Sequence, residues 1–478
     1  MSRKRTKHSW IYFLSCGYNA SIFLFWVSSS GRFEYSAGHV EAISVRPEQQ
    51  NQHHIAGIGG TTSVHYFSET SSLLVGTKKG GIYYSLIEQE QNQDANNGDF
   101  DPVTGNKRNN RPDDADENDT DRWIELKSNE YTTKYPIYST AVMSGKIINS
   151  PPPENGNDDK KFIFCGSGDR WISVWKLGNT NNDNRIPNFR NQAPEVEYVQ
   201  KLGPHTGWVK DLVYDDRNRL LHSIGCNCIE TWDCSSVDEG HNDHASNPIS
   251  HITKRTIENC PTTGSTLSSD LLCLCLLPSL ATNENELPRL LVSGGVDGRI
   301  HLWLSDPTAE RTYGTTTTIT IDLDGRIPLH TTLAHDGRVN AIVYSSAINA
   351  IVTVGNDGLL CVFRASLDKG FELVSRLKIE EGSNENTSRI IVALITRDFD
   401  EQGRCSLVVG SSKGELWFVR VEINAQGGID SHVERDCMIV VENSMIYSIA
   451  SEKDSGPKGS PRLWIGHASG LAMVDAYT

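Results

Sequence analysis

One short pattern recurs along the chain and constrains its fold more than any other feature of the sequence. In each copy an apolar strand leads into a tight turn that usually holds Asp and Gly. A second strand follows, whose side chains alternate between the two faces of the sheet up to an aromatic residue. Glycine allows the positive φ that such turns need, and alternation places every second side chain on one face of a sheet. The three clearest copies align without gaps over residues 164–175, 292–303 and 352–363. Each copy is therefore predicted to be a β-hairpin.

Four weaker copies bring the number of hairpins to seven. They lie at residues 73–84, 220–233, 407–419 and 463–474. In three of them the turn Asp is replaced, by Lys79, Lys413 or Ser469. A repeated hairpin cannot bury its hydrophobic faces alone, but a ring of stacked copies can, and seven is a usual number of blades for a β-propeller. We therefore predict an all-β fold, a seven-bladed β-propeller of four-stranded antiparallel sheets.

Each blade needs one strand before its hairpin and one strand after it. The expected first strands are residues 63–67, 137–143, 208–214, 271–277, 339–344, 390–395 and 445–450. The expected outer strands are residues 123–127, 196–202, 251–257, 319–323, 371–379 and 432–440. The seventh hairpin is followed by no further strand, whereas Val40–Val45 alternates in the required way. We predict that this N-terminal strand, called the latch below, completes the last blade and closes the ring, because closure hides the sheet edges.

The hairpins and the residues around them resemble the WD-repeat (WD40) family of β-propellers, from about Gly38 to the C-terminus. Trp232-Asp233 is the signature dipeptide of that family. The resemblance implies a buried hydrogen-bond chain of His, Ser or Thr, Trp and Asp within a blade. It assigns this structural role to Asp169, Trp175, His205, Ser223, Trp232, Asp233, Ser293, Asp297, Trp303, His335, Thr353 and Asp357.

Two segments fall outside the repeats of the predicted propeller, residues 38–478. Residues 88–121 are rich in Asn, Asp, Gln and Gly, so we predict a disordered insertion. Residues 1–37 combine a basic start, an apolar run and small residues, the layout of a secretory signal peptide or signal anchor. Residues 10–27 are thus a candidate membrane-associated segment. Eleven cysteines without a C-x-x-C pair fit a reducing compartment instead. Three locations stay open: the ER route, a plastid reached through the ER, and the cytoplasm. Whether residues 1–30 are cleaved also stays open.

Composition and motifs favour neither nucleic-acid binding nor catalysis. A net charge of −15 is unfavourable for nonspecific contact with phosphate backbones. Cys226 and Cys228 are followed by no His pair at zinc-finger spacing, so we expect no metal site and no cofactor. P-loop, H-E-x-x-H and G-x-S-x-G motifs are absent, and the repeat explains His205 and His335 as structural residues. We therefore expect no catalytic residues and no enzyme activity.

The face that carries the hairpin turns and the loops entering each blade is the expected working surface. Aromatic and Arg side chains anchor interfaces because they bury a large area at low entropic cost. The candidate partner-binding residues of this kind, with one Lys, are Trp208, Arg338, Arg170, Trp171, Arg299 and Lys413. We expect a scaffold that docks proteins or peptides, a monomeric propeller within a larger complex. Two alternatives stay open: a membrane-anchored or organelle-targeted assembly or regulatory subunit, and a propeller enzyme with a site in the central channel.

Overall fold

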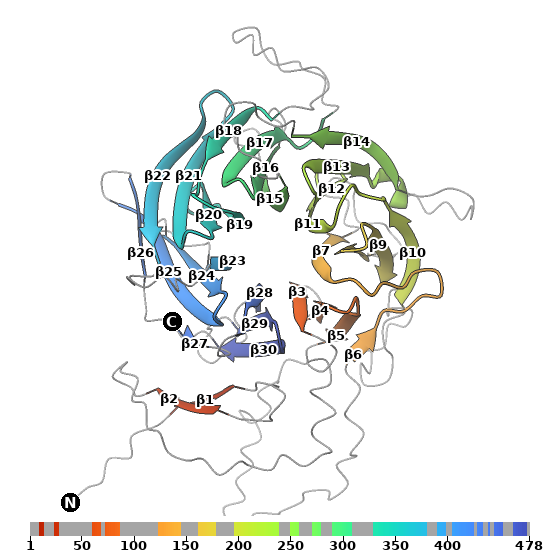
Figure 1. Cartoon of the computed structure of the whole chain (residues 1–478), viewed down its shortest axis with the longest axis horizontal. Helices are drawn as coiled ribbons and strands as arrows, with labels where there is room; N and C mark the ends of the chain where they lie inside the picture. The colour runs from red at the N-terminus through yellow and green to blue at the C-terminus, as the bar shows by residue number, and fades with distance from the viewer. Residues whose placement is uncertain are drawn as a thin grey trace, which may run out of the picture.

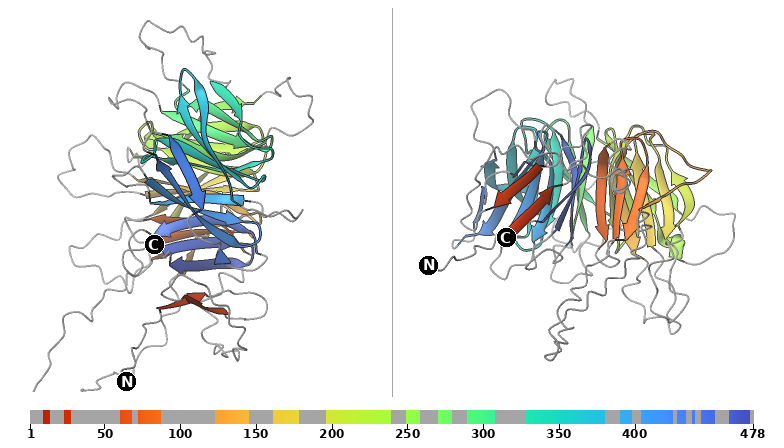
Figure 2. Two further views of the ribbon diagram at one scale, coloured as in Figure 1. Left: turned by 90° about the vertical axis from the view of Figure 1, so that its left-hand side faces the viewer. Right: turned by 90° about the horizontal axis from the view of Figure 1, so that it is seen from below.

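Short strands account for almost all of the regular structure, and they pair into seven small antiparallel sheets. In the computed structural model these sheets stand as blades in a ring around a central opening (Figure 1). Figure 2 shows the strands of neighbouring blades running side by side, roughly along the axis of the ring. The predicted seven-bladed β-propeller is confirmed.

The structure describes the strands and most of the tight turns. These residues are 9–13, 23–27, 60–67, 72–86, 123–144, 161–177, 196–238, 249–257, 270–278, 289–307, 328–379, 390–397, 404–424, 428–433, 438–439, 444–452 and 462–475. The latch at 40–45 and the insertion at 88–121 lie outside them, so both remain predictions.

Each blade is ordered from the strand nearest the central opening outward. Blades one to three are β3 (Thr61–Phe67), β4 (Ser72–Thr77), β5 (Ile82–Leu86) and β6 (Trp123–Glu125); β7 (Ile137–Ser144), β8 (Lys161–Ser167), β9 (Ile172–Leu177) and β10 (Val196–Leu202); and β11 (Val209–Asp215), β12 (Leu220–Gly225), β13 (Cys228–Asp233) and β14 (Ser250–Thr256).

Blades four to seven continue the same order. They are β15 (Leu271–Leu277), β16 (Leu290–Gly295), β17 (Arg299–Leu304) and β18 (His330–Leu333); β19 (Val339–Ser345), β20 (Ala350–Gly355), β21 (Leu359–Ser366) and β22 (Gly370–Lys378); β23 (Ile390–Arg397), β24 (Arg404–Ser411) and β25 (Glu415–Ile423), which pairs with both β26 (Ile429–Val433) and β27 (Met438–Ile439); and β28 (Ile446–Glu452), β29 (Arg462–His467) and β30 (Gly470–Asp475).

The hydrophobic core lies between neighbouring blades. The second strand of a blade is buried along its whole length in β4, β12, β16 and β20, because both of its faces pack on other sheets. Leu74 and Tyr84 of blade one, for example, share a cluster with Ile163 and Trp175 of blade two. Packing of adjacent blades therefore buries the hydrophobic faces that no single hairpin could bury alone.

The two ends of the propeller meet through side-chain packing between blades one and seven. Val64, Leu73 and Val75 of blade one form a cluster with Ala450 of blade seven, and Trp464 packs against it. The described part of blade seven has three strands, β28 to β30, so its outer position is the place that the latch is predicted to fill.

Two outer strands differ from the sequence prediction. The predicted outer strand of blade four, residues 319–323, is wrong: β18 (His330–Leu333) pairs with β17, and residues 319–323 lie outside the described part. The β-branched run at 315–321 carries the higher β propensity, but tertiary contacts decide the pairing. Here the N–H groups of Leu329 and Ala334 bond to β17 and to its turn, on either side of the strand. In blade six the single strand predicted at 432–440 is two short ones, β26 and β27.

The apolar N-terminal segment contains a pair of strands. β1 (Ser9–Phe13) and β2 (Phe23–Val27) pair antiparallel, with Trp10 opposite Trp26. The pair lies beside β30 of blade seven (Figure 1). None of the helices in the described part of the chain has the length and apolar character that a membrane crossing requires. A role of residues 10–27 in targeting stays a prediction.

Deleting the latch, residues 40–45, is expected to lower the melting temperature by roughly 5 °C, because the outer edge of blade seven would lose its partner strand. Differential scanning fluorimetry on the full chain measures this. Deletion of residues 92–97 from the predicted insertion is the length-matched control and should leave the melting temperature unchanged. Equal melting temperatures for the two deletions would show that residues 40–45 do not close the ring.

Candidate functional site

An exposed aromatic residue on the turn-bearing face lies where the chain enters blade three. Trp208, just before β11, keeps 52% of its surface exposed. Its ring stacks on that of Tyr138 from β7, with centroids 5.9 Å apart and planes at 21°. Lys210 Nζ lies 3.9 Å from the centroid of the Tyr138 ring and 4.5 Å from that of Trp208. Blades two and three thus jointly hold a lysine against two stacked aromatic rings.

Positive charge accumulates around this lysine. Burial lowers the pKa of Lys210 to about 8, and the positive charge of Arg338 lowers it further, against the opposing effect of Asp270. Arg338 is exposed and directly precedes β19 of blade five, the position that Trp208 occupies before β11. The structure therefore brings these two predicted partner-binding residues to the same end of the ring, where Trp208 contacts Lys210 and the charge of Arg338 acts on it.

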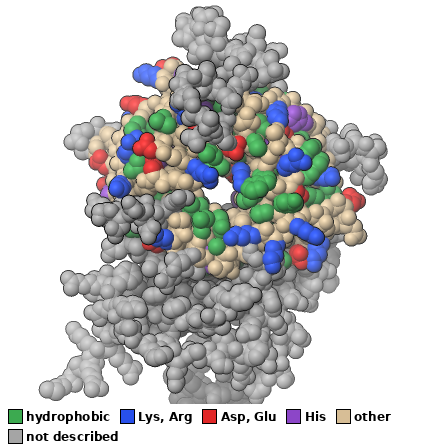
Figure 3. Space-filling view, in the orientation of Figure 1, with side chains coloured by type: hydrophobic (Ala, Val, Ile, Leu, Met, Phe, Trp, Pro, Cys, Tyr) green, Lys and Arg blue, Asp and Glu red, His purple; other side chains and the backbone are tan. Residues whose placement is uncertain are grey.

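A second lysine lies against an aromatic ring where blade one meets blade seven. Lys78 Nζ, in the turn after β4, lies 4.7 Å from the centroid of the Tyr447 ring in β28. Burial raises the pKa of the Tyr138 phenol, and the proximity of Tyr447 raises it further. We call the resulting set the mouth surface: Trp208, Tyr138, Lys210, Arg338, Tyr447 and Lys78. Figure 3 shows Lys and Arg side chains alternating with hydrophobic ones around the central opening.

The predicted partner-binding residues of blade two belong to its hairpin turn. Arg170 is exposed, with a positive φ of 76°. Trp171 is half-buried and packs on the core, and Lys201 Nζ lies 4.5 Å from its ring centroid. Asp169 accepts the Trp171 N–H (3.1 Å) and the Tyr131 hydroxyl (3.1 Å). These contacts fix the turn and do not connect it to the mouth surface.

The remaining two predicted partner-binding residues are also held by their own turns. Arg299 Nε lies 3.8 Å from Asp297 Oδ2, and Asp297 Oδ1 accepts the Arg299 N–H (3.1 Å). The N–H of Lys413 donates to Ser411 Oγ (3.2 Å), which supports a turn without Asp. Both residues are part-buried, so they offer less surface to a partner than Trp208 does.

The hydrogen-bond chain implied by the repeat is nearly complete in blade five. His335 lies between Asp357 and Thr353, with Nδ1 2.9 Å from Asp357 Oδ1 and Nε2 2.9 Å from Thr353 Oγ1. Asp357 also accepts the N–H groups of Asp336 (3.0 Å) and Leu359 (3.1 Å). This carboxylate therefore joins the loop entering the blade to the hairpin turn.

The other blades keep parts of the chain. In blade three, His205 Nε2 and Trp232 Nε1 both bond to Ser223 Oγ, at 2.7 and 2.9 Å. Asp233, the other half of the signature dipeptide, accepts the N–H of Ser235 (2.8 Å) at the start of the 3-10 helix η3 (Ser235–Asp238). In blades two and four the indole N–H groups donate to nearby serines: Trp175 to Ser173 (2.9 Å) and Trp303 to Ser293 (3.0 Å).

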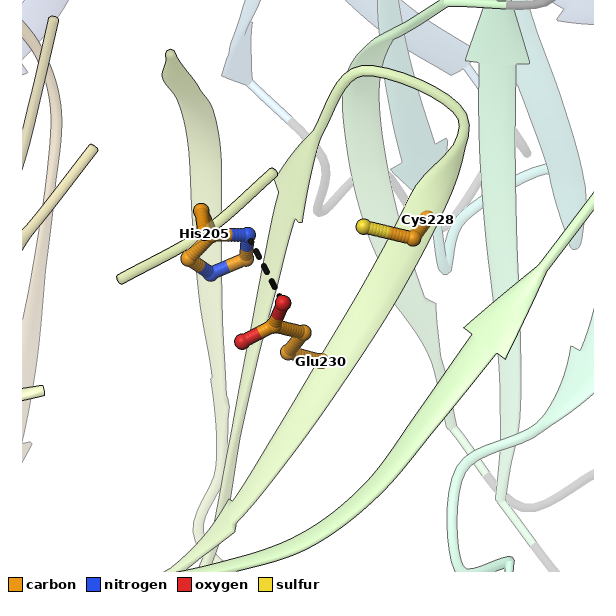
Figure 4. Close-up of side chains that lie close together, drawn as sticks. All are labelled: His205, Cys228 and Glu230. Carbon is orange, nitrogen blue, oxygen red and sulfur yellow. Dashed lines mark ion pairs between the residues drawn. The ribbon is translucent and has the colours of Figure 1, made fainter. Parts of the chain in front are cut away.

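The far side of the His205 ring meets a cluster that the repeat does not explain. Its Nδ1 lies 3.6 Å from Glu230 Oε1, and the thiol of Cys228 is close by (Figure 4). Burial, with the charge of Lys254 nearby, lowers the pKa of His205 to about 3, so the ring is neutral. Burial raises the pKa values of Glu230 and Cys228 above their ordinary values.

Sequence reasoning missed a buried polar network between blades three and four. His222 Nε2 lies 2.9 Å from Ser305 Oγ, and Ser305 Oγ donates to Asp215 Oδ2 (2.5 Å). Arg255 is fully buried, donates to Thr231 Oγ1 (3.0 Å), and has its pKa lowered to about 10 by burial. A charged residue inside an alternating strand was the only sequence signal, and it is a common one at exposed positions.

The fold and these contacts define a seven-bladed β-propeller with a basic and aromatic channel mouth. A scan against models of protein families matches none, and a search of curated proteins finds no significant relative.

Proposed function

We propose that this protein is a non-enzymatic interaction scaffold of the WD-repeat family, which docks an acidic peptide segment of a partner protein on the mouth surface. The family part of the proposal is supported by the His335–Thr353–Asp357 chain of blade five and by the His205–Ser223–Trp232 chain of blade three. Both chains combine the residue types expected of WD repeats, at the expected places in the blade.

The observation that carries the docking proposal is the position of Lys210 against the stacked rings of Tyr138 and Trp208. Its ammonium group is part-buried, and Arg338 adds a second positive charge nearby. A carboxylate that approached this point would meet two cations at reduced solvation, where a charge-assisted hydrogen bond is strong. The exposed Trp208 ring offers apolar area beside it, the usual composition of an interface anchor.

Charge selects the class of partner. The chain as a whole carries a net charge of −15, so acidic partners are repelled at long range. The mouth surface is a local exception, with Lys78, Lys210 and Arg338 at one end of the ring. An acidic segment flanked by apolar side chains would therefore be attracted to this region in preference to the rest of the surface.

A Trp208→Ala/Arg338→Ala double variant is expected to recover its partners at least about tenfold less well than the native protein, because truncating an aromatic or Arg hot spot costs about 2 kcal/mol or more. Affinity purification with quantitative mass spectrometry measures the recovery. Added polyglutamate should compete with the same partners, whereas a neutral peptide of equal length should not.

The control is an Arg364→Ala/Leu373→Ala variant, which removes an exposed Arg and an exposed apolar residue from the outer part of blade five. It should recover partners as the native protein does. Unchanged recovery by the Trp208→Ala/Arg338→Ala variant would refute the mouth surface as the docking site. Resistance to polyglutamate would refute the acidic class of partner.

A further inference from the structure

The hairpin of blade three lacks the group that would complete its hydrogen-bond chain. It is one residue shorter than the hairpins of blades four and five, and its turn holds only Cys226 and Asn227 between the paired residues Gly225 and Cys228. In blade five a turn Asp binds Nδ1 of the histidine. Blade three offers no turn carboxylate, so its histidine must find another partner or none.

Nδ1 of His205 has no hydrogen-bond partner within the described part of the chain, although the side chain is fully buried (0% exposed). An orphaned buried nitrogen is costly and uncommon, and it calls for a ligand. The nearest oxygen, Glu230 Oε1, is 3.6 Å away, which is beyond a hydrogen bond. Because the imidazole is neutral, this nitrogen can present a lone pair.

A thiol completes the group. Cys228 is buried at the start of β13, two residues before Glu230, and its sulfur points toward the His205 ring (Figure 4). One ligand atom from each of the three residues lies within 4.8 Å of the other two. We propose, against the expectation drawn from cysteine spacing, that His205 Nδ1, Cys228 Sγ and a Glu230 carboxylate oxygen bind a zinc ion. This site is independent of the docking function proposed above.

The chemistry and the spacing fit zinc. Zinc takes neutral imidazole, thiolate and carboxylate ligands at about 2.0–2.3 Å in a tetrahedron, which puts ligand atoms about 3.3–3.8 Å apart. The distance between His205 Nδ1 and Glu230 Oε1 already lies in that range, at 3.6 Å. The Cys228 sulfur lies within 4.8 Å of both other ligand atoms, so a shift of about 1 Å or less would bring it into that range. The soft thiolate favours zinc over magnesium or calcium, which select oxygen ligands.

Lys254 and His251 lie beside the Glu230 carboxylate at the edge of the site. Lys254 Nζ lies 3.8 Å from Glu230 Oε1, and 43% of its side chain is exposed, so it can withdraw into solvent when a cation binds. His251 Nε2 lies 3.9 Å from Glu230 Oε2, beside the same carboxylate.

Cobalt(II) is the probe, because a thiolate ligand gives it an intense near-ultraviolet absorption band that zinc lacks. The full chain is stripped with a chelator, kept reduced and titrated with cobalt. We expect about one equivalent to bind with this thiolate band, and zinc to displace it. Glu230→Gln should weaken cobalt binding at least about tenfold, and Cys228→Ser should abolish the thiolate band.

Lys254→Gln should act in the opposite direction and tighten cobalt binding about two- to fivefold, since it removes a competing cation whose exposed ion pair is worth up to about 1 kcal/mol. A variant that was only destabilised would not bind cobalt more tightly. Cys234→Ser is the matched control, because Cys234 is a buried thiol of the same blade outside the cluster, and it should bind cobalt as the native protein does.

The proposal is overturned if the native chain gives no thiolate band, or if Cys228→Ser retains the band. It is overturned equally if Cys234→Ser loses the band as Cys228→Ser does. Melting curves recorded for each variant identify unfolded protein. If Cys228→Ser proves unfolded, Glu230→Gln and Lys254→Gln decide: unchanged cobalt affinity in both rejects the site.

Discussion

Replacing Asp215 with Ala is expected to lower the free energy of unfolding by about 3–5 kcal/mol, the largest effect of any single change considered, because it breaks a buried ion pair and network. Asp215 is fully buried at the end of β11. It accepts Arg289 Nη1 (2.8 Å) and the Ser305 hydroxyl (2.5 Å) from blade four, and the Asn218 amide (2.9 Å) from its own turn. The substitution would leave these donors without their acceptor and separate two adjacent blades.

Asp216→Ala is the matched control for that experiment. Asp216 is the next residue and contacts the same Arg289 guanidinium, but 57% of its side chain is exposed. Because exposed ion pairs contribute about 0–1 kcal/mol, its removal should change stability little. Urea denaturation followed by tryptophan fluorescence measures both variants. Equal losses for the two would mean that the buried network does not hold blades three and four together.

Replacing Asp357 with Ala is expected to lower the free energy of unfolding by about 2–4 kcal/mol, because it leaves buried groups without a charged partner. It removes the acceptor of His335 and of two backbone N–H groups, those of Asp336 and Leu359. Asp336→Ala, which alters an exposed neighbour, should cost less than about 0.5 kcal/mol. Urea denaturation at neutral pH measures both variants.

The contribution of Asp357 also depends on pH. Burial alone would raise the pKa of this carboxyl, but the hydrogen bond and charge of His335, with the backbone N–H groups, hold the pKa below its ordinary value of 3.8. A carboxylate with a depressed pKa stabilises the fold above its unfolded pKa and loses that contribution as the pH falls through its folded pKa. The difference in stability between native protein and Asp357→Asn should therefore be full at pH 6 and shrink below about pH 4. A difference that grows on acidification would contradict this.

The architecture could be predicted because each copy of the repeat meets the conformational requirements of its own hairpin. Each hairpin needs a residue at positive φ, and Gly298 and Gly358 supply it, at φ of 79° and 73°. At Gly298 a Cβ would lie 2.1 Å from the carbonyl oxygen of His335, so the close approach of the entering loop also requires glycine. Glycine takes this position in most copies, whereas Arg170 and Cys226 adopt the positive φ in blades two and three.

The interblade contacts could not be predicted, because they join residues far apart in the chain. Ser305 meets Asp215 ninety residues away, and nothing in the sequence around either residue indicates the other. Trp208 and Arg338 were placed on one face by their equivalent positions, but Tyr138 and Lys210 were missed, since a cation against two stacked rings is created only by the packing of adjacent blades. The cluster around His205 lies within blade three and escaped prediction for a different reason, because its residues follow no ligand-spacing motif.

A photocrosslinker placed at the channel mouth tests directly whether an acidic partner docks on the mouth surface. Tyr135, 53% exposed and two residues before β7, lies next to Gly168, as does Tyr138 of the mouth surface, whereas Leu373, 45% exposed, lies in β22, the outer strand of blade five. Benzoylphenylalanine is introduced at one position or the other, so the two variants differ only in where the crosslinker lies. We expect crosslinks to a partner from position 135, suppressed by polyglutamate, and none above background from position 373. Crosslinks from position 373 alone, or from position 135 without competition by polyglutamate, would contradict it.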